Sequence, residues 1–241
     1  MSATIWNNNY SFIKDEVKAM IVDRTAIFQN REHAAHLLGE RLMVYKNADA
    51  VVVAVSGGGI HIGAYLAKLL QLRLEVIPCR KIKHPADEQK TIGAVSAEAV
   101  VFHEEEHNIP QDYIYHQIQL MQHAIQRQCK RYHKETLRQL LEDRIIILVD
   151  DLVMTGDTML ASIRTIRNYG PLEIIVAVPI VTPEGTRAIA DEMDKILYLT
   201  IEPQPMGRVY KDFPDVPQEE VLEILRKSRS RTNPGEEFWS N

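Results

Sequence analysis

Two adjacent acids followed by a loop of threonine and glycine are the chemically most informative segment of this 241-residue sequence. Asp150 and Asp151 directly follow the apolar run 145–149, and the loop occupies residues 155–158. Ligands of open parallel sheets bind outside the carboxyl ends of strands. A helix beginning at this loop would offer N–H groups to a phosphate, and the threonine hydroxyls would add donors. The acids can accept hydrogen bonds from sugar hydroxyls or hold Mg²⁺. An ordinary strand-to-helix turn does not explain the pair, because crowding two acids without a partner costs free energy.

Short apolar runs alternate with helical patterns along the chain, which predicts βαβ units and a mostly parallel α/β sheet. We expect strands at 51–55, 74–79, 145–149, 174–178 and 196–199, and helices at 30–45, 62–70, 114–132, 158–169 and 217–227, with another opening at Thr182. Residues 80–110 are polar and predict an excursion from the core, with a hairpin near 93–102.

Composition restricts the classes of protein to which the chain can belong. No internal repeat or linker interrupts it, so we expect a single domain over 1–241 with a tail at 228–241. A formal charge of −5 argues against a nucleic-acid-binding surface. Two cysteines without a CxxC motif favour a reducing, cytoplasmic location. The first ten residues do not resemble a signal peptide, and no apolar run reaches the roughly 18 residues of a membrane span.

The acid pair and its loop resemble the motif with which type I phosphoribosyltransferases bind phosphoribosyl pyrophosphate (PRPP). That motif is an apolar strand, two acids, apolar residues and then Thr-Gly-x-Thr. Weaker similarities to a subgroup of predicted bacterial phosphoribosyltransferases follow in the correct order. They comprise Arg24, Phe28, Arg31, residues 51–59, 80–82, Pro85, Glu88, 92–95, 210–213 and 219–221.

The resemblance implies an open, mostly parallel twisted sheet with helices on both faces and a small hood. The core would span about 24–200, and the hood about 83–110 and 202–227. The implied activity is transfer of phosphoribose from PRPP to a nitrogenous base with release of pyrophosphate. Mg²⁺ would be the cofactor, and PRPP and a nucleobase-like molecule the partners. Because many family members are dimers, a homodimer is also expected.

The resemblance also implies a role for each matching residue. Asp150 and Asp151 would hold the ribose hydroxyls near Mg²⁺, and residues 155–158 would cradle the 5-phosphate. The backbone of residues 56–59 would contact the pyrophosphate, and Arg80 and Lys81 would neutralise it as it leaves. Asp150, Asp151 and Lys81 are thus the expected catalytic residues. The expected ligand-binding residues are Ser56, Gly57, Gly58, Gly59, Arg80, Lys81, Asp150, Asp151, Met154, Thr155, Gly156, Asp157 and Thr158.

Two positions depart from the family and keep a second function open. Ser56-Gly57 stands where the subgroup has Pro-Arg, so one cation is missing on the pyrophosphate side. Met154 stands where the hypoxanthine–guanine enzymes place an acid, so no general base can be assigned. The alternative to an enzyme is therefore a regulatory domain that binds PRPP without turnover.

Three further motifs have simpler interpretations. Residues 103–107 match HExxH, but without a helix to align the histidines a solvated acidic loop is expected instead of a zinc site. The glycines at 57, 59 and 63 resemble a dinucleotide-binding turn, but no acid ends the second strand. The basic residues between 226 and 231 are expected to be solvated.

Overall fold

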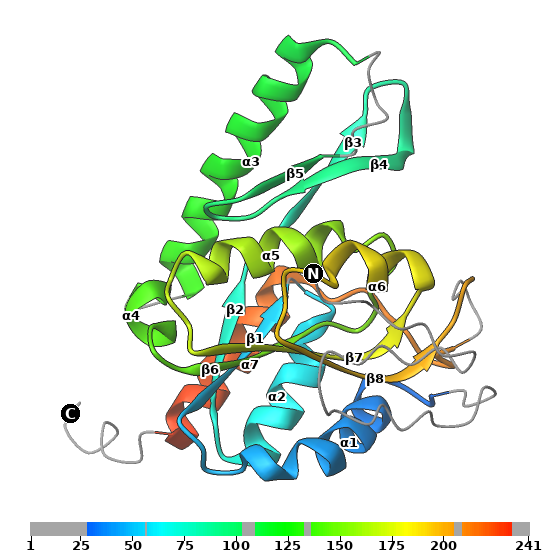
Figure 1. The fold of residues 1–241 in the computed structure, drawn as a ribbon. Coiled ribbons are helices and arrows are strands. Elements are labelled where there is room, and N and C mark those ends of the chain that lie inside the picture. Colours follow the sequence, from blue (N-terminus) through cyan, green and yellow to red (C-terminus); the bar gives the residue numbers. More distant parts are fainter. Residues whose placement is uncertain (1–27, 56, 103–108, 133–135, 205–208, 233–241) are drawn as a thin grey trace.

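A five-stranded parallel sheet lies at the centre of the computed structural model (Figure 1), which describes residues 28–55, 57–102, 109–132, 136–204 and 209–232. The strands run in the order β2-β1-β6-β7-β8, and every neighbouring pair is parallel. Their bounds are β1 Ala50–Val55, β2 Arg73–Ile77, β6 Ile145–Val149, β7 Glu173–Val181 and β8 Lys195–Ile201. The α/β fold class predicted from the sequence is confirmed.

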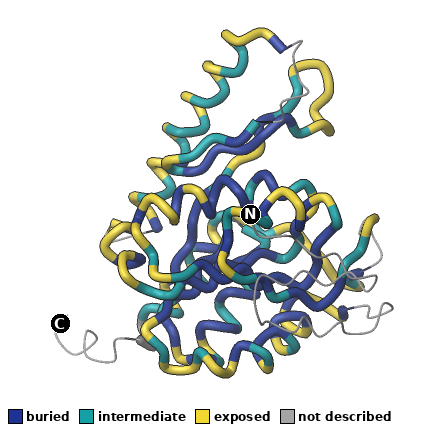
Figure 2. Tube along the Cα trace, viewed as in Figure 1, coloured by how far each residue is buried: buried dark blue, intermediate teal, exposed yellow. Residues whose placement is uncertain are grey.

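Helices cover both faces of this sheet (Figure 1). One face carries α1 Arg31–Leu42, the short 3₁₀ helix Met43–Tyr45, α2 Gly59–Leu70 and α7 Gln218–Thr232. The other carries α4 Leu137–Leu141, α5 Asp157–Arg167 and α6 Pro183–Ile189. Every residue of β1 is buried, as expected for a strand covered on both sides (Figure 2). Among the described helices, none is long and apolar enough to span a bilayer.

A small antiparallel sheet stands above α5 and forms the hood (Figure 1). It consists of β3 Arg80–His84, β4 Asp87–Val95 and β5 Val100–Phe102, in that order, and contains the expected hairpin. The long helix α3 Gln111–Tyr132 packs on it, and Ile125 is completely buried there with Ile82 and Ile92. The apolar stripe of α3 therefore packs into the core of the hood. The hood thus includes α3 and begins at Arg80, so it is larger than the segment 83–110 expected from the sequence.

The late segment, expected as a second part of the hood at 202–227, lies on the core where the structure describes it. Helix α7 packs against α2 and β2, and the backbone of residues 209–212 pairs with that of residues 28–29. The expected tail is also shorter, since α7 continues to Thr232. Arg229 is not a solvated tail residue. It forms an ion pair of 2.8 Å with the fully buried Glu75 on β2, which Arg73 also binds at 2.7 Å.

Replacing Arg229 with alanine is expected to lower the free energy of unfolding by about 2–3 kcal/mol, because it removes one cation from a carboxylate that water cannot reach. Urea denaturation measures the change. The exposed Arg226, on the same helix, is the matched control, and its alanine variant should lose less than about 0.5 kcal/mol. Equal losses in the two variants would refute the role of Arg229.

Candidate functional site

The acid pair lies at the carboxyl end of the central strand β6, next to the glycine loop that ends the neighbouring strand β1. The two segments are in direct contact. A Cβ on Gly58 would overlap the carboxylate of Asp151, and a Cβ on Gly59 would lie 2.7 Å from the carbonyl oxygen of Val149. Any side chain at either position would push the loop and the acids apart. The glycines are therefore required by close packing, which brings their backbone to the acids.

Asp150 is a buried carboxylate in a repulsive environment. Its Oδ1 accepts a hydrogen bond of 2.9 Å from the N–H of Asp151. Burial raises the pKa of Asp150 well above its usual range, and the negative charge of Asp151 raises it further. The N–H of Asp151 and the positive charges of Lys81 and Arg31 lower this pKa, but they do not compensate for the burial. A bound cation or hydrogen-bond donor would therefore stabilise the charged form of Asp150.

Asp151 is held by two residues whose role the sequence did not reveal. The Nε of Arg31 donates a hydrogen bond of 2.9 Å to its Oδ2, and the hydroxyl of Tyr210 donates one of 3.0 Å to its main-chain oxygen. The side chains of Arg31 and Asp151 are only 9% and 13% exposed. Both partners had appeared in the family resemblance, but they lie 120 and 59 residues from Asp151 in the chain. No local motif could pair them.

The loop after the acids forms the N-terminal end of α5. Gly156 has a φ of +86°, which favours glycine, and a Cβ there would lie 2.8 Å from that of Ala188. Thr155 donates a hydrogen bond of 2.7 Å to the carboxylate of the buried Asp157, which fixes the loop. The first N–H groups of α5 have no partners within the helix and can bind an anion.

A second support of this loop comes from α6, which the sequence reasoning had not connected with the site. The Thr182 hydroxyl caps α6 by accepting from the N–H of Gly185, and it donates to the main-chain oxygen of Met154. Val153 pairs with β7 through its N–H and its oxygen. A Cβ on Gly185 would lie 2.8 Å from the oxygen of Val153. The end of β7 and the start of α6 thus pack against residues 153–154 and support them.

Arg80 and Lys81 begin the first strand of the hood, and successive strand residues point to opposite faces. Lys81 is exposed, and its charge acts on Asp150. Arg80 instead lines a cavity of about 210 Å³ together with Gly57, Tyr132 and Val216. The structure therefore places one cation near the acids and the other beside the glycine loop. Ser56 lies outside the described residues, as do His103 and His107 of the HExxH motif.

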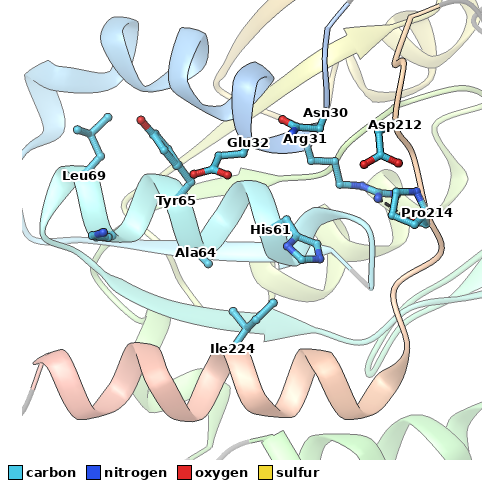
Figure 3. A pocket seen from close by; sticks show the side chains of 11 residues that line it. Asn30, Arg31, Glu32, His61, Ala64, Tyr65, Leu69, Asp212, Pro214 and Ile224 are labelled. Carbon is cyan, nitrogen blue, oxygen red and sulfur yellow. Dashed lines mark hydrogen bonds between the residues drawn. The ribbon is translucent and has the colours of Figure 1, made fainter.

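A larger cavity of about 670 Å³ lies between α1, α2 and α7 (Figure 3). Arg31 forms part of its wall and extends toward Pro214, while His61, Tyr65 and Lys68 line it from α2. Nε2 of His61 lies 3.1 Å from the Glu220 carboxylate. Arg31 therefore connects the two sites, because it lines this cavity and also binds the carboxylate of Asp151.

Residues 23–207 match the model of a family described as the phosphoribosyl transferase domain. Two curated proteins of Mycobacterium tuberculosis, from strains CDC 1551 and H37Rv and each named "Putative phosphoribosyl transferase", are 26% identical over 215 residues. The match covers 84% of this chain, but the chain spans about half, 47%, of the length of these relatives. The crystal structure of TT1426 from Thermus thermophilus is similar, with 27% identity and a TM-score of 0.66. That similarity covers 83% of this chain and 98% of TT1426.

Proposed function

This chain belongs to the phosphoribosyl transferase domain family, and from that premise we propose that it binds PRPP and transfers the phosphoribosyl group to a nitrogenous base. The observation that supports this most strongly is the position of three elements at one edge of the sheet. The acid pair, of which Asp150 is buried, lies beside the glycine loop, and the N-terminal end of α5 follows the pair after a short loop. This arrangement offers one site each for ribose hydroxyls, a pyrophosphate and a 5-phosphate.

Each part of PRPP has a matching partner in the proposal. The N–H groups at the start of α5 and the hydroxyls of Thr155 and Thr158 bind the 5-phosphate. Asp150 and Asp151 accept hydrogen bonds from the ribose hydroxyls. The backbone N–H groups of residues 57–59, with Arg80 at the adjoining cavity, bind the pyrophosphate.

In the proposed reaction the bond between C1 of the ribose and the pyrophosphate oxygen breaks, and a bond between C1 and a nitrogen of the base forms. The bonding electrons leave with the pyrophosphate, so positive charge develops on the sugar ring while negative charge accumulates on the leaving group. Asp150 and Asp151 hold the ring, and the charge of Lys81 favours the departing pyrophosphate. Catalysis would rest on positioning and electrostatic stabilisation.

The acid pair also fits a magnesium ion. Mg²⁺ prefers carboxylate and phosphate oxygens, and burial together with the mutual repulsion of the acids favours a bound cation. Asp150 and Asp151 would be the protein ligands, and the ion would neutralise part of the charge of the pyrophosphate.

The alternative is a domain of the same family that senses PRPP without turnover. The side chain of Met154 supports it, because this residue is 38% exposed at the loop and its thioether cannot act as a base. A single-domain organisation, a cytoplasmic location and a homodimer also remain predictions from the sequence.

Release of pyrophosphate decides between the two functions. The assay combines the protein with PRPP, Mg²⁺ and one member at a time of a panel of purine, pyrimidine and pyridine bases. The enzyme proposal predicts release that depends on at least one base. Tight binding of PRPP without release for any base would identify a sensor.

A further inference from the structure

The late segment of residues 209–214, which we call the clasp, is hydrogen-bonded to residues 28–29, the first that the structure describes. The N–H of Phe28 donates to the oxygen of Val209 at 2.7 Å, and the N–H of Lys211 donates to the oxygen of Phe28 at 2.9 Å. The ring of Tyr210 packs on that of Phe28, with centroids 5.5 Å apart. Phe28 is fully buried, so the clasp is anchored in the core.

The clasp holds the guanidinium group of Arg31 from two directions. Nη1 of Arg31 donates a hydrogen bond of 2.7 Å to the main-chain oxygen of Pro214. The guanidinium carbon lies 3.9 Å from the centre of the Phe213 ring, and that ring is stacked on Tyr210 at 4.7 Å. These contacts orient the guanidinium group so that its Nε donates to the carboxylate of Asp151 (Figure 3 shows Arg31 and Pro214).

Arg31 also affects the glycine loop through Asp151. The Asp151 carboxylate lies against Gly58, so its orientation determines how far the loop can approach the acids. Without Arg31 this carboxylate would lose the guanidinium group that pairs with it, and more negative charge would remain beside the place proposed for the pyrophosphate. A ligand with several negative charges would then be repelled.

We propose that Arg31 is a positioning residue for Asp151 and that the clasp fixes Arg31 for this task. Arg31 acts through Asp151 on both the ribose and the pyrophosphate part of the site. The affinity for PRPP thus depends on segments far apart in the sequence, at residues 28–31 and 209–214. This inference rests on the proposed function, since PRPP is the ligand whose binding it concerns.

A double-mutant cycle on the affinity for PRPP with Mg²⁺, measured by calorimetry, tests the inference. Arg31→Met should weaken binding about tenfold to a hundredfold, because a charge-assisted hydrogen bond to a carboxylate is lost. In a chain that already carries Asp151→Asn, the same change should have little further effect. Arg31→Lys should restore part of the affinity, since it returns the charge without the planar geometry.

Arg41→Met is the matched control, because Arg41 lies on the same helix, about 15 Å further along its axis, and should leave binding unchanged. Should Arg31→Met not fold, Tyr210→Phe removes only the hydroxyl bound to the main chain of Asp151 and should weaken binding about threefold to tenfold.

The outcomes separate this inference from the proposed function. If the wild-type protein binds PRPP but folded Arg31→Met binds it equally well, the inference is wrong and the function stands. Losses from Arg31→Met and Asp151→Asn that simply add would also overturn it, as would a Tyr210→Phe variant with unchanged affinity. If the wild-type protein does not bind PRPP, the proposed function fails and the inference fails with it.

Discussion

Gly58→Ala is expected to weaken binding of PRPP with Mg²⁺ by about a hundredfold or more. The added Cβ would overlap the Asp151 carboxylate, which Arg31 holds in place. The loop or the acid must therefore move by a substantial fraction of an ångström, and such a displacement in a preorganised site can cost about two orders of magnitude. Isothermal titration calorimetry measures the affinity, and circular dichroism shows whether the variant is folded.

Gly57→Ala is the matched control for this prediction. A Cβ at Gly57 would lie 3.2 Å from the oxygen of Val216, a tight contact that a small shift of either segment relieves. Its effect on affinity should be several times smaller than that of Gly58→Ala. Equal losses for the two variants would show that the contact between Gly58 and Asp151 does not shape the site.

Lys81→Ala is expected to reduce the rate of pyrophosphate release by about a hundredfold or more, with a smaller effect on the affinity for PRPP. The backbone N–H groups of the glycine loop supply partial charges only, and Ser56-Gly57 provides no cation. Lys81 is the exposed cation whose charge reaches Asp150, and a preorganised donor of this kind contributes about 3–4 kcal/mol at the transition state. Steady-state kinetics with the active base separate kcat from KM.

Two further variants give this experiment its controls. Lys83→Ala changes a lysine of the same strand two residues away and should leave kcat nearly unchanged. Arg80→Ala should act mainly on KM, because Arg80 lines the cavity beside Gly57 and not the region of the acids. If Lys81→Ala and Arg80→Ala both match an active wild-type protein, neither cation compensates for the missing one.

The core of the fold could be predicted because its elements carry local signals. Strand β6 spans the residues expected from the apolar run. A strand buried on both faces is apolar at every position, so the first and last apolar residues mark its ends. The caps of two helices were equally clear. Asn30 accepts from the N–H of His33, and Thr182 accepts from the N–H of Gly185, as their residue types predict.

Contacts between distant segments could not be predicted from one sequence. The pair of Arg31 with Asp151 and the pair of Arg229 with Glu75 join residues 120 and 154 positions apart. A basic residue near a chain end has the same appearance whether it is solvated or ion-paired, so Arg229 was assigned to the wrong environment. Helix α3 shows the same limit, because its apolar stripe indicates burial but not the sheet against which it is buried.

The thermal midpoint of unfolding with and without PRPP and Mg²⁺ tests the central claim, that the acid pair and its loop bind PRPP. A ligand that binds only the folded state raises this midpoint. We expect a clear, concentration-dependent rise for the wild-type protein and little or none for the double variant Asp150→Asn with Asp151→Asn. Asparagine preserves the size of each side chain while removing its charge. A rise of equal size in both proteins would show that PRPP binds elsewhere and would contradict binding by the acid pair.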